Sequence, residues 1–210
     1  MNRILATISM TVMLALASGC ASMSAEECAY SDWSAVGYGD GARGYTSDRF
    51  SAHNKACAKH GVAADFSAYQ EGREDGLREF CQPSRGYQLG ENGGRYNGVC
   101  AADLEPDFLD AYRIGSHLHT LRSNVNSASS GIAVRERELE DIESSMLSKE
   151  LRLIDKEATT EERIQILADL KNHSERTGEL EAEIKQLYSD LARYETELRD
   201  YENTIVAYGY

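Results

Sequence analysis

The sequence lacks the features that mark a membrane-spanning, nucleic-acid-binding or catalytic protein. No apolar run comes close to the about 20 residues that a transmembrane helix needs. Basic residues are too few to attract nucleic acid or anionic lipid, since 22 lysines and arginines stand against 35 acidic residues. Neither a Gly-x-Ser-x-Gly, a His-Glu-x-x-His nor a phosphate-loop motif occurs. We therefore expect no nucleic-acid partner, no cofactor and no enzymatic activity.

What the chain does have is a secretion signal at its start. Residues 1–3 include one positive charge, and residues 4–17 form an uncharged apolar run that is too short to span a bilayer. The small residues that follow end in Cys20, which resembles the lipobox of bacterial lipoproteins. Ala17, three residues before Cys20, stands where a lipobox usually has leucine. The alternative is therefore cleavage by the ordinary signal peptidase, which would give a soluble secreted protein.

Lipobox cleavage predicts a lipid-anchored protein. Residues 1–19 would be removed as a lipoprotein signal peptide, and the thiol of Cys20 would carry the acyl chain, such as palmitate. The residue after Cys20 is Ala21 and not aspartate. By resemblance to enterobacterial sorting rules, this implies that the mature protein goes to the outer membrane. We therefore expect a cell-envelope protein that faces the periplasm and contacts the membrane through lipid on Cys20.

The rest of the chain changes composition near residue 105. Residues 20–104 hold most of the glycine and four further cysteines, whereas residues 105–210 are rich in charge and in helical periodicity. This predicts an all-α protein, in which a small disulfide-stapled helical domain over 20–104 precedes a long antiparallel helical hairpin, or coiled coil, over 105–210. Four cysteines in an oxidising compartment predict two disulfides. They are Cys28, Cys57, Cys81 and Cys100.

Helical geometry narrows the pairing. The patterns over residues 47–60 and 65–81 predict two helices with Gly61 as the stop between them. In such a hairpin Cys57 lies beside the turn and Cys81 about 24 Å along the second helix. Bridged cysteines need Cα atoms within about 7 Å. Cys57 with Cys81 is therefore the least favourable pair, which leaves two of the three possible pairings open. Of these we favour Cys28 with Cys57, across the preceding helical hairpin, and Cys81 with Cys100, closing a glycine-rich loop, over Cys28 with Cys81 and Cys57 with Cys100.

A metal site is the alternative at the same place. His53, Cys57 and His60 are spaced i, i+4 and i+7, so one helix face could present all three as zinc ligands. A disulfide at Cys57 would remove the central ligand, and an oxidising compartment favours that disulfide. We therefore predict no metal site.

A glycine pattern recurs in the same region. Glycines stand four apart over residues 37–41 and 72–76, and more loosely over 90–94, each preceded by an aromatic residue. Such spacing lets another helix backbone approach closely, at a cost of about 1 kcal/mol of helix propensity per glycine. The pattern predicts a tightly packed helical core. A groove that binds a small ligand or a peptidoglycan fragment is the alternative.

Several short motifs occur together in this region. They are Glu27-Cys28, Asp32-Trp33, residues 37–42, Lys55-Ala56-Cys57, residues 68–73, Gly76-Leu77, Cys81 and residues 96–100. In combination they resemble a family of small proteobacterial lipoproteins known as a domain of unknown function, over about residues 20–121. The resemblance implies an envelope lipoprotein with a helical, cysteine-bearing domain, and it brings no activity or catalytic residue.

The second part carries two heptad seams of equal length, at residues 111–153 and 166–208. Thr159 and Glu162 have capping-box spacing and mark a helix start between the seams, so we predict an antiparallel hairpin. Two helices of about 50 residues would each extend about 75 Å. Four polar residues interrupt the seams and can set register or oligomeric state. They are Arg135, Lys149, His173 and Thr177.

These observations predict a structural or protein-interaction lipoprotein. Its hairpin would bind an envelope protein or a second copy of itself, while the stapled domain stays near the membrane. The alternative is a periplasmic module that binds a small ligand or peptidoglycan fragment. A third possibility is a hairpin with a charged surface and no partner.

Overall fold

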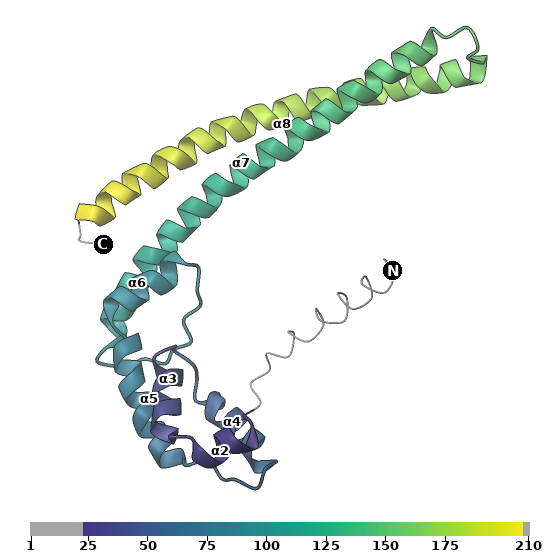
Figure 1. The fold of residues 1–210 in the computed structure, drawn as a ribbon. Coiled ribbons are helices and arrows are strands. Elements are labelled where there is room, and N and C mark those ends of the chain that lie inside the picture. The colour runs from purple at the N-terminus through teal and green to yellow at the C-terminus, as the bar shows by residue number, and fades with distance from the viewer. Residues whose placement is uncertain (1–22, 208–210) are drawn as a thin grey trace, which may run out of the picture. The chain divides into compact units, whose positions relative to one another are not determined.

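The computed structural model describes residues 23–207, and every regular element in that range is an α-helix, which confirms the all-α prediction. Figure 1 shows their order along the chain. The signal peptide over 1–19, Cys20 and the last seam residue, Tyr208, lie outside the described residues. The helices are α2 (Ala25–Tyr30), α3 (Trp33–Gly41), α4 (Asp48–Ala58), α5 (Phe66–Phe80), α6 (Pro83–Glu91), α7 (Glu105–Leu153) and α8 (Thr160–Ala207).

The chain divides into two compact units. Within the described residues, one unit comprises the chain up to Gly86 with Arg95–Leu109, and the other comprises Tyr87–Gly94 with the chain from Asp110 onward. Among the described residues, no helix is both long enough and apolar enough to cross a membrane.

Local sequence signals set the helix boundaries in the first unit. The Asp32 carboxylate accepts hydrogen bonds from the backbone N–H groups of Ser34 and Ala35, and Asp65 caps α5 in the same way. Gly61 follows α4 with a φ of +74°, a conformation that favours glycine, which confirms its predicted place between the two helices. The core then forms around Trp33 and Tyr69.

Glycines bring α3 and α5 into backbone contact. A Cβ at Gly37 would lie 2.0 Å from the Tyr69 carbonyl oxygen, and one at Gly72 would lie 1.9 Å from the Ser34 carbonyl oxygen. No side chain fits at such distances, so the predicted tight packing is confirmed. The glycine faces fill each other and leave no groove for a ligand between them.

Most of the second unit is the helical hairpin of α8 and of α7 from Asp110 onward (Figure 1). Every predicted seam residue within the described range is buried or half-buried, from Ala111 to Leu153 and from Ile166 to Ile205. The α7 helix continues without a break through the serine-rich residues 123–131. Each helix buries its apolar stripe against the other helix. This packing stabilises two long helices that would otherwise expose those stripes to water.

The predicted capping box closes the turn of the hairpin. The Thr159 hydroxyl accepts from the Glu162 backbone N–H at 3.2 Å, and the Glu162 carboxylate accepts from the Thr159 backbone N–H at 2.8 Å. Arg163 also donates to the carbonyl oxygens of Leu153 and Asp155 at the end of α7. The turn is therefore held by hydrogen bonds from both sides.

Candidate functional site

The four predicted cysteines form two disulfides in the first unit. Cys28 bonds to Cys57 with Cα atoms 5.4 Å apart, and Cys81 bonds to Cys100 with Cα atoms 5.7 Å apart. The predicted pairing is confirmed. Because its sulfur is bonded to Cys28, Cys57 does not act as a zinc ligand between His53 and His60.

A buried polar cluster joins three helices in the same unit. Oδ2 of Asp40 on α3 lies 2.8 Å from Nε2 of His53 on α4 and accepts a hydrogen bond of 2.9 Å from the Tyr69 hydroxyl on α5. Arg49 lies at its edge, with Nε 3.8 Å from the same carboxylate. Burial, and then the Asp40 hydrogen bond, raise the pKa of Tyr69 well above its usual range.

The chemistry of this cluster fits a structural role. A carboxylate beside a histidine can orient the imidazole for base catalysis, but that use needs a nucleophile on the other ring nitrogen. Nδ1 of His53 is buried without a hydrogen-bond partner in the described chain, and Trp33 and Tyr69 pack beside the ring. The cluster therefore holds α3, α4 and α5 together.

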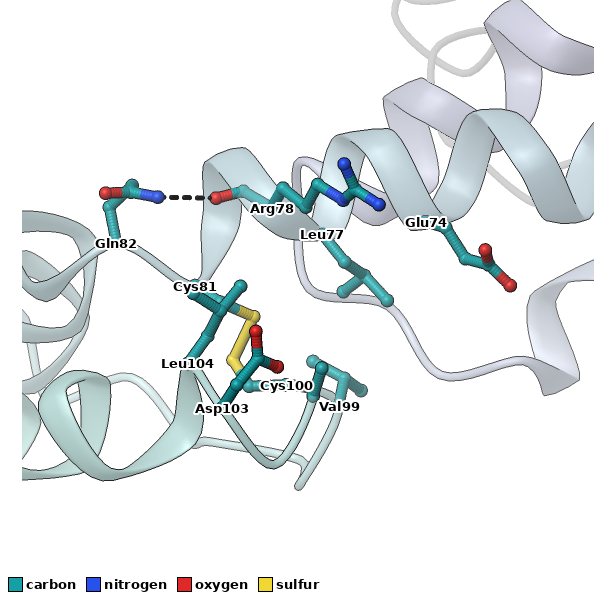
Figure 2. A pocket seen from close by; sticks show the side chains of 10 residues that line it. Glu74, Leu77, Arg78, Cys81, Gln82, Val99, Cys100, Asp103 and Leu104 are labelled. Carbon is teal, nitrogen blue, oxygen red and sulfur yellow. Dashed lines mark hydrogen bonds between the residues drawn. A yellow bond between two sulfur atoms is a disulfide. The ribbon is translucent and has the colours of Figure 1, made fainter.

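An open groove lies beside the second disulfide, with a volume of about 750 Å³. Figure 2 shows Leu77 of α5 and Val99 of the loop between α6 and α7 beside it, with the disulfide of Cys81 and Cys100 next to them. Its rim carries Glu74, Arg78 and Asp103. The guanidinium of Arg78 forms no ion pair with another residue of the range 23–207, so it can meet an anionic group from solution.

The hairpin interface in the second unit contains charged side chains as well as the seam. Arg176 of α8 donates to both oxygens of Glu138 on α7, at 2.8 and 3.2 Å, and also contacts Glu183. The seam residue Arg135 pairs with the same Glu183. These hydrogen bonds from arginine hold the pKa of Glu138 and of Glu183 below their usual range.

A second seam cation is paired closer to the turn. Nζ of Lys149 lies 2.6 Å from Oδ2 of Asp169. The hydrogen bond from Lys149, and then that from Gln165, hold the pKa of Asp169 below its usual range. The cations that interrupt the predicted seam are thus satisfied within the hairpin, and neither needs a partner from outside.

Five large aliphatic side chains near the turn are exposed, although the seam itself is closed. We name this group the tip patch, and its side chains are 55% to 74% exposed. Aliphatic residues on the outer faces of a charged hairpin cost solubility, and a cluster of them is typical of a protein interaction site. The members are Leu147, Leu151, Ile154, Ile164 and Leu167.

Comparison with known proteins finds a family for the first part of the chain, but that family has no known activity. Residues 32–117 match the family described as "Protein of unknown function (DUF2799)". The match confirms the resemblance to an uncharacterised family over that segment. It covers less than half of the 210 residues and ends within α7, before the tip patch. No curated protein and no solved structure matches the chain.

The tip patch is the feature that the sequence interpretation missed. A signal was present, because Leu147, Leu151 and Ile154 have the i, i+4, i+7 spacing of a second apolar stripe beside the seam. The partners in the Asp40 cluster were also missed, since they come from three helices and carry no joint spacing.

Proposed function

We propose that this protein is a cell-envelope lipoprotein, anchored through Cys20 to the outer membrane and facing the periplasm, whose hairpin binds a protein. The observation that carries the interaction role is the tip patch. The seam is occupied within the hairpin, so it offers nothing to a partner, whereas the tip patch exposes five aliphatic side chains to water. The proposal assigns no catalytic role to any residue.

The short distance in sequence between Cys20 and the first unit supports a location at the membrane surface. Met23 packs against the core of that unit, with its sulfur 3.9 Å from Sγ of Cys57. Three residues of chain span at most about 11 Å. Lipid on Cys20 would therefore hold the first unit directly at the bilayer.

The anchor is tested by the intact mass of the protein from the membrane fraction, with thiols alkylated before and after reduction. We expect a mass that fits two or three acyl groups on a chain beginning at Cys20, with four further cysteines alkylated only after reduction. An unacylated chain in the soluble periplasmic fraction would contradict the anchor and leave the interaction role untouched.

The interaction role is tested by photo-crosslinking in living cells, with benzoylphenylalanine placed at Leu147, Leu151 or Ile164. Val134 on α7 is the matched control, since it is a 54% exposed aliphatic residue outside the tip patch. We expect a discrete protein adduct from the patch positions and none from position 134. Equal labelling at all four positions, or none at any, would refute a role for the patch.

The groove beside Cys81 and Cys100 supports a second candidate, a small-ligand or peptidoglycan-fragment site. Its volume of about 750 Å³ falls in the range of ligand pockets, and its apolar base with a charged rim is typical of them. Val99→Trp would fill the groove, and Glu71→Trp, on the exposed side of α5 and outside the groove, is the matched control. Calorimetry with soluble peptidoglycan fragments should then show binding that only Val99→Trp abolishes, and no heat with the wild-type chain would exclude this candidate.

A further inference from the structure

We propose that Arg49 and Arg73 bind an oxyanion, a carboxylate or phosphate group, at the surface of the first unit beside Tyr45. The inference goes beyond the proposed function, since it involves neither the tip patch nor the groove beside the second disulfide. It follows from a helix pair that the chain contains twice, once with charged residues at this place and once without them.

The two helix pairs share a close backbone contact. In the first pair, α3 and α5, a Cβ at Gly41 would lie 2.3 Å from the carbonyl oxygen of Arg73. In the second pair, α6 and the start of α7, a Cβ at Gly90 would lie 2.2 Å from the carbonyl oxygen of Tyr112. The two glycines therefore correspond, as do Arg73 and Tyr112.

A second contact repeats in the opposite direction. A Cβ at Gly76 of α5 would lie 2.2 Å from the carbonyl oxygen of Tyr38. A Cβ at Gly115 of α7 would lie 2.1 Å from the carbonyl oxygen of Tyr87. Each of these residues in α6 follows its counterpart in α3 by the same number of positions, and α7 follows α5 in the same way. The chain therefore contains one type of helix pair in two copies.

The first pair differs from the second in the polar groups at its centre. In the first pair, Asp40 accepts a hydrogen bond from the Tyr69 hydroxyl. In the second pair, Leu89 and Phe108 occupy the corresponding positions. The same close packing of helices is therefore compatible with two apolar residues, and polar groups that packing does not require are typical of functional sites.

Arg73 differs from its counterpart in the same sense. Its Nη2 donates to the Tyr45 carbonyl oxygen at 2.8 Å, in the turn after α3. In the second pair, the Tyr112 hydroxyl donates to the Gly94 carbonyl oxygen at 3.0 Å. This hydrogen bond needs a donor and no charge, so packing does not explain the positive charge of Arg73.

Arg49 of α4 brings a second guanidinium to the same turn. Its Cζ lies 5.0 Å from the centroid of the Tyr45 ring, while Arg73 binds the backbone of that residue. Burial and the Asp40 hydrogen bond raise the pKa of Tyr69, and the charges of both arginines oppose that rise, so both lie near its hydroxyl. The side chain of Arg49 is 36% exposed and Tyr45 is 39% exposed, so an anion can approach from solvent.

The donors of the two arginines exceed the acceptors around them. Nε of Arg49 and Nε of Arg73 are buried and have no hydrogen-bond partner among the residues that the structure describes. In the same part of the chain, Asp40 is the one carboxylate that pairs with either arginine, at 3.8 Å from Nε of Arg49. It already contacts His53 and Tyr69. Two guanidiniums with one shared carboxylate leave an excess of positive charge and of donors, which an oxyanion would balance.

Thermal unfolding in inorganic phosphate tests the site, with sodium chloride added to keep the ionic strength constant. The mature chain with Cys20→Ser is used, because it would lack only the proposed acyl groups. A ligand that binds the folded state raises the melting temperature until the site is saturated. The chain has a net charge of −13 and repels anions in general, so a saturating rise indicates a specific site. We expect this rise with phosphate and with acetate, and no rise with either anion would overturn the proposal.

Arg73→Tyr is the sharpest variant, because the tyrosine of the second pair keeps the hydrogen bond to the turn without the charge. The chain should stay folded and should need about tenfold more phosphate for half of the rise. Arg49→Gln should have the same effect. Only the rise caused by phosphate is compared, so a change in the stability of the chain itself does not affect the result.

Arg95→Gln is the matched control. Arg95 follows the corresponding turn of the second pair, is exposed and forms no ion pair within residues 23–207. This variant should respond to phosphate as the unchanged chain does. The same response from all of the variants would overturn the assignment to Arg49 and Arg73.

Short-chain phosphatidylglycerol, used below the concentration at which it forms micelles, identifies the source of the oxyanion. A rise at lower concentrations than inorganic phosphate needs, lost in Arg73→Tyr, supports the site and assigns it to lipid headgroups. An equal or weaker response supports it as a site for a free anion. Photo-crosslinking from Leu147 should be the same in all of these variants, since none of them changes the tip patch, so failure here is distinct from failure of the proposed function.

Discussion

Tyr69 on α5 donates its phenolic hydrogen to Oδ2 of Asp40 on α3 across 2.9 Å, and His53 approaches the same oxygen from α4. Asp40→Ala leaves both partners buried without an acceptor and should lower the free energy of unfolding by about 3 kcal/mol. Urea unfolding with the disulfides intact measures this loss. Asp75→Ala on the exposed side of α5 is the control, with a change within about 0.5 kcal/mol. Equal effects of the two changes would contradict a special role for Asp40.

Gly72→Ala should destabilise the first unit by about 3 kcal/mol, because the new Cβ would lie 1.9 Å from the Ser34 carbonyl oxygen and force α3 and α5 apart. Gly39→Ala is the matched control, since a Cβ there meets no atom within 4 Å. It should stabilise α3 by about 1 kcal/mol through helix propensity. Thermal unfolding compares the two, and a neutral Gly72→Ala would show that the helices can separate at no cost.

Thr177→Val should stabilise the hairpin by about 1 kcal/mol. The Thr177 hydroxyl is buried in the seam and finds no hydrogen-bond partner in the described chain, while valine keeps the shape and the helix propensity. The control is Thr196→Val, since the Thr196 hydroxyl already donates to the Ala192 carbonyl on an exposed face. Calorimetry should show a higher melting temperature for the first variant only, and a lower one would mean that the hydroxyl is satisfied.

The hairpin should lose stability as the pH falls below about 4.5. Arg176 and Arg135 lower the pKa of Glu138 and Glu183 in the folded chain relative to the ordinary value of 4.5. A carboxyl whose pKa is lower in the folded state stabilises that state above the unfolded pKa, and protonation removes the contribution as the pH falls. Urea midpoints between pH 3 and pH 6 measure the slope.

Glu183→Gln should flatten that slope, because it removes one of the two carboxylates. Glu195→Gln is the control, since Glu195 is exposed and forms no ion pair among residues 23–207. The same slope in both variants would show that the contacts of Glu183 with Arg135 and Arg176 contribute nothing.

Periodicity made the second unit predictable. A helical seam depends on residues three and four apart, so the stripe from Ala111 to Leu153 could be found without knowing its partner, and the Thr159 capping box marked the turn. Helix rise also separates Cys57 from Cys81, which ruled out one of the three possible disulfide pairings. It did not choose between the other two pairings, and that choice depended on which segments each disulfide would close.

Contacts between distant segments were not predictable in the same way. No sequence pattern predicts that the carboxylate of Asp40 accepts a hydrogen bond from the hydroxyl of Tyr69, which lies 29 positions later. The tip patch was missed although its spacing is visible in the sequence. Leu147, Leu151 and Ile154 are spaced i, i+4 and i+7, but an apolar residue next to a long seam is interpreted as part of the core until its exposure is known.

Arg176 has a consequence for how the hairpin finds its alignment. On α8 it occupies the same heptad position as the acids Glu162, Asp169, Glu183 and Asp190. If α8 slipped by one heptad in one direction, Lys149 would exchange Asp169 for Arg176, and in the other direction Arg135 would exchange Glu183 for Arg176. Either slip sets two cations against each other in the seam. One arginine among acids thus acts as an alignment key, which lets a long and repetitive hairpin fold in a single register.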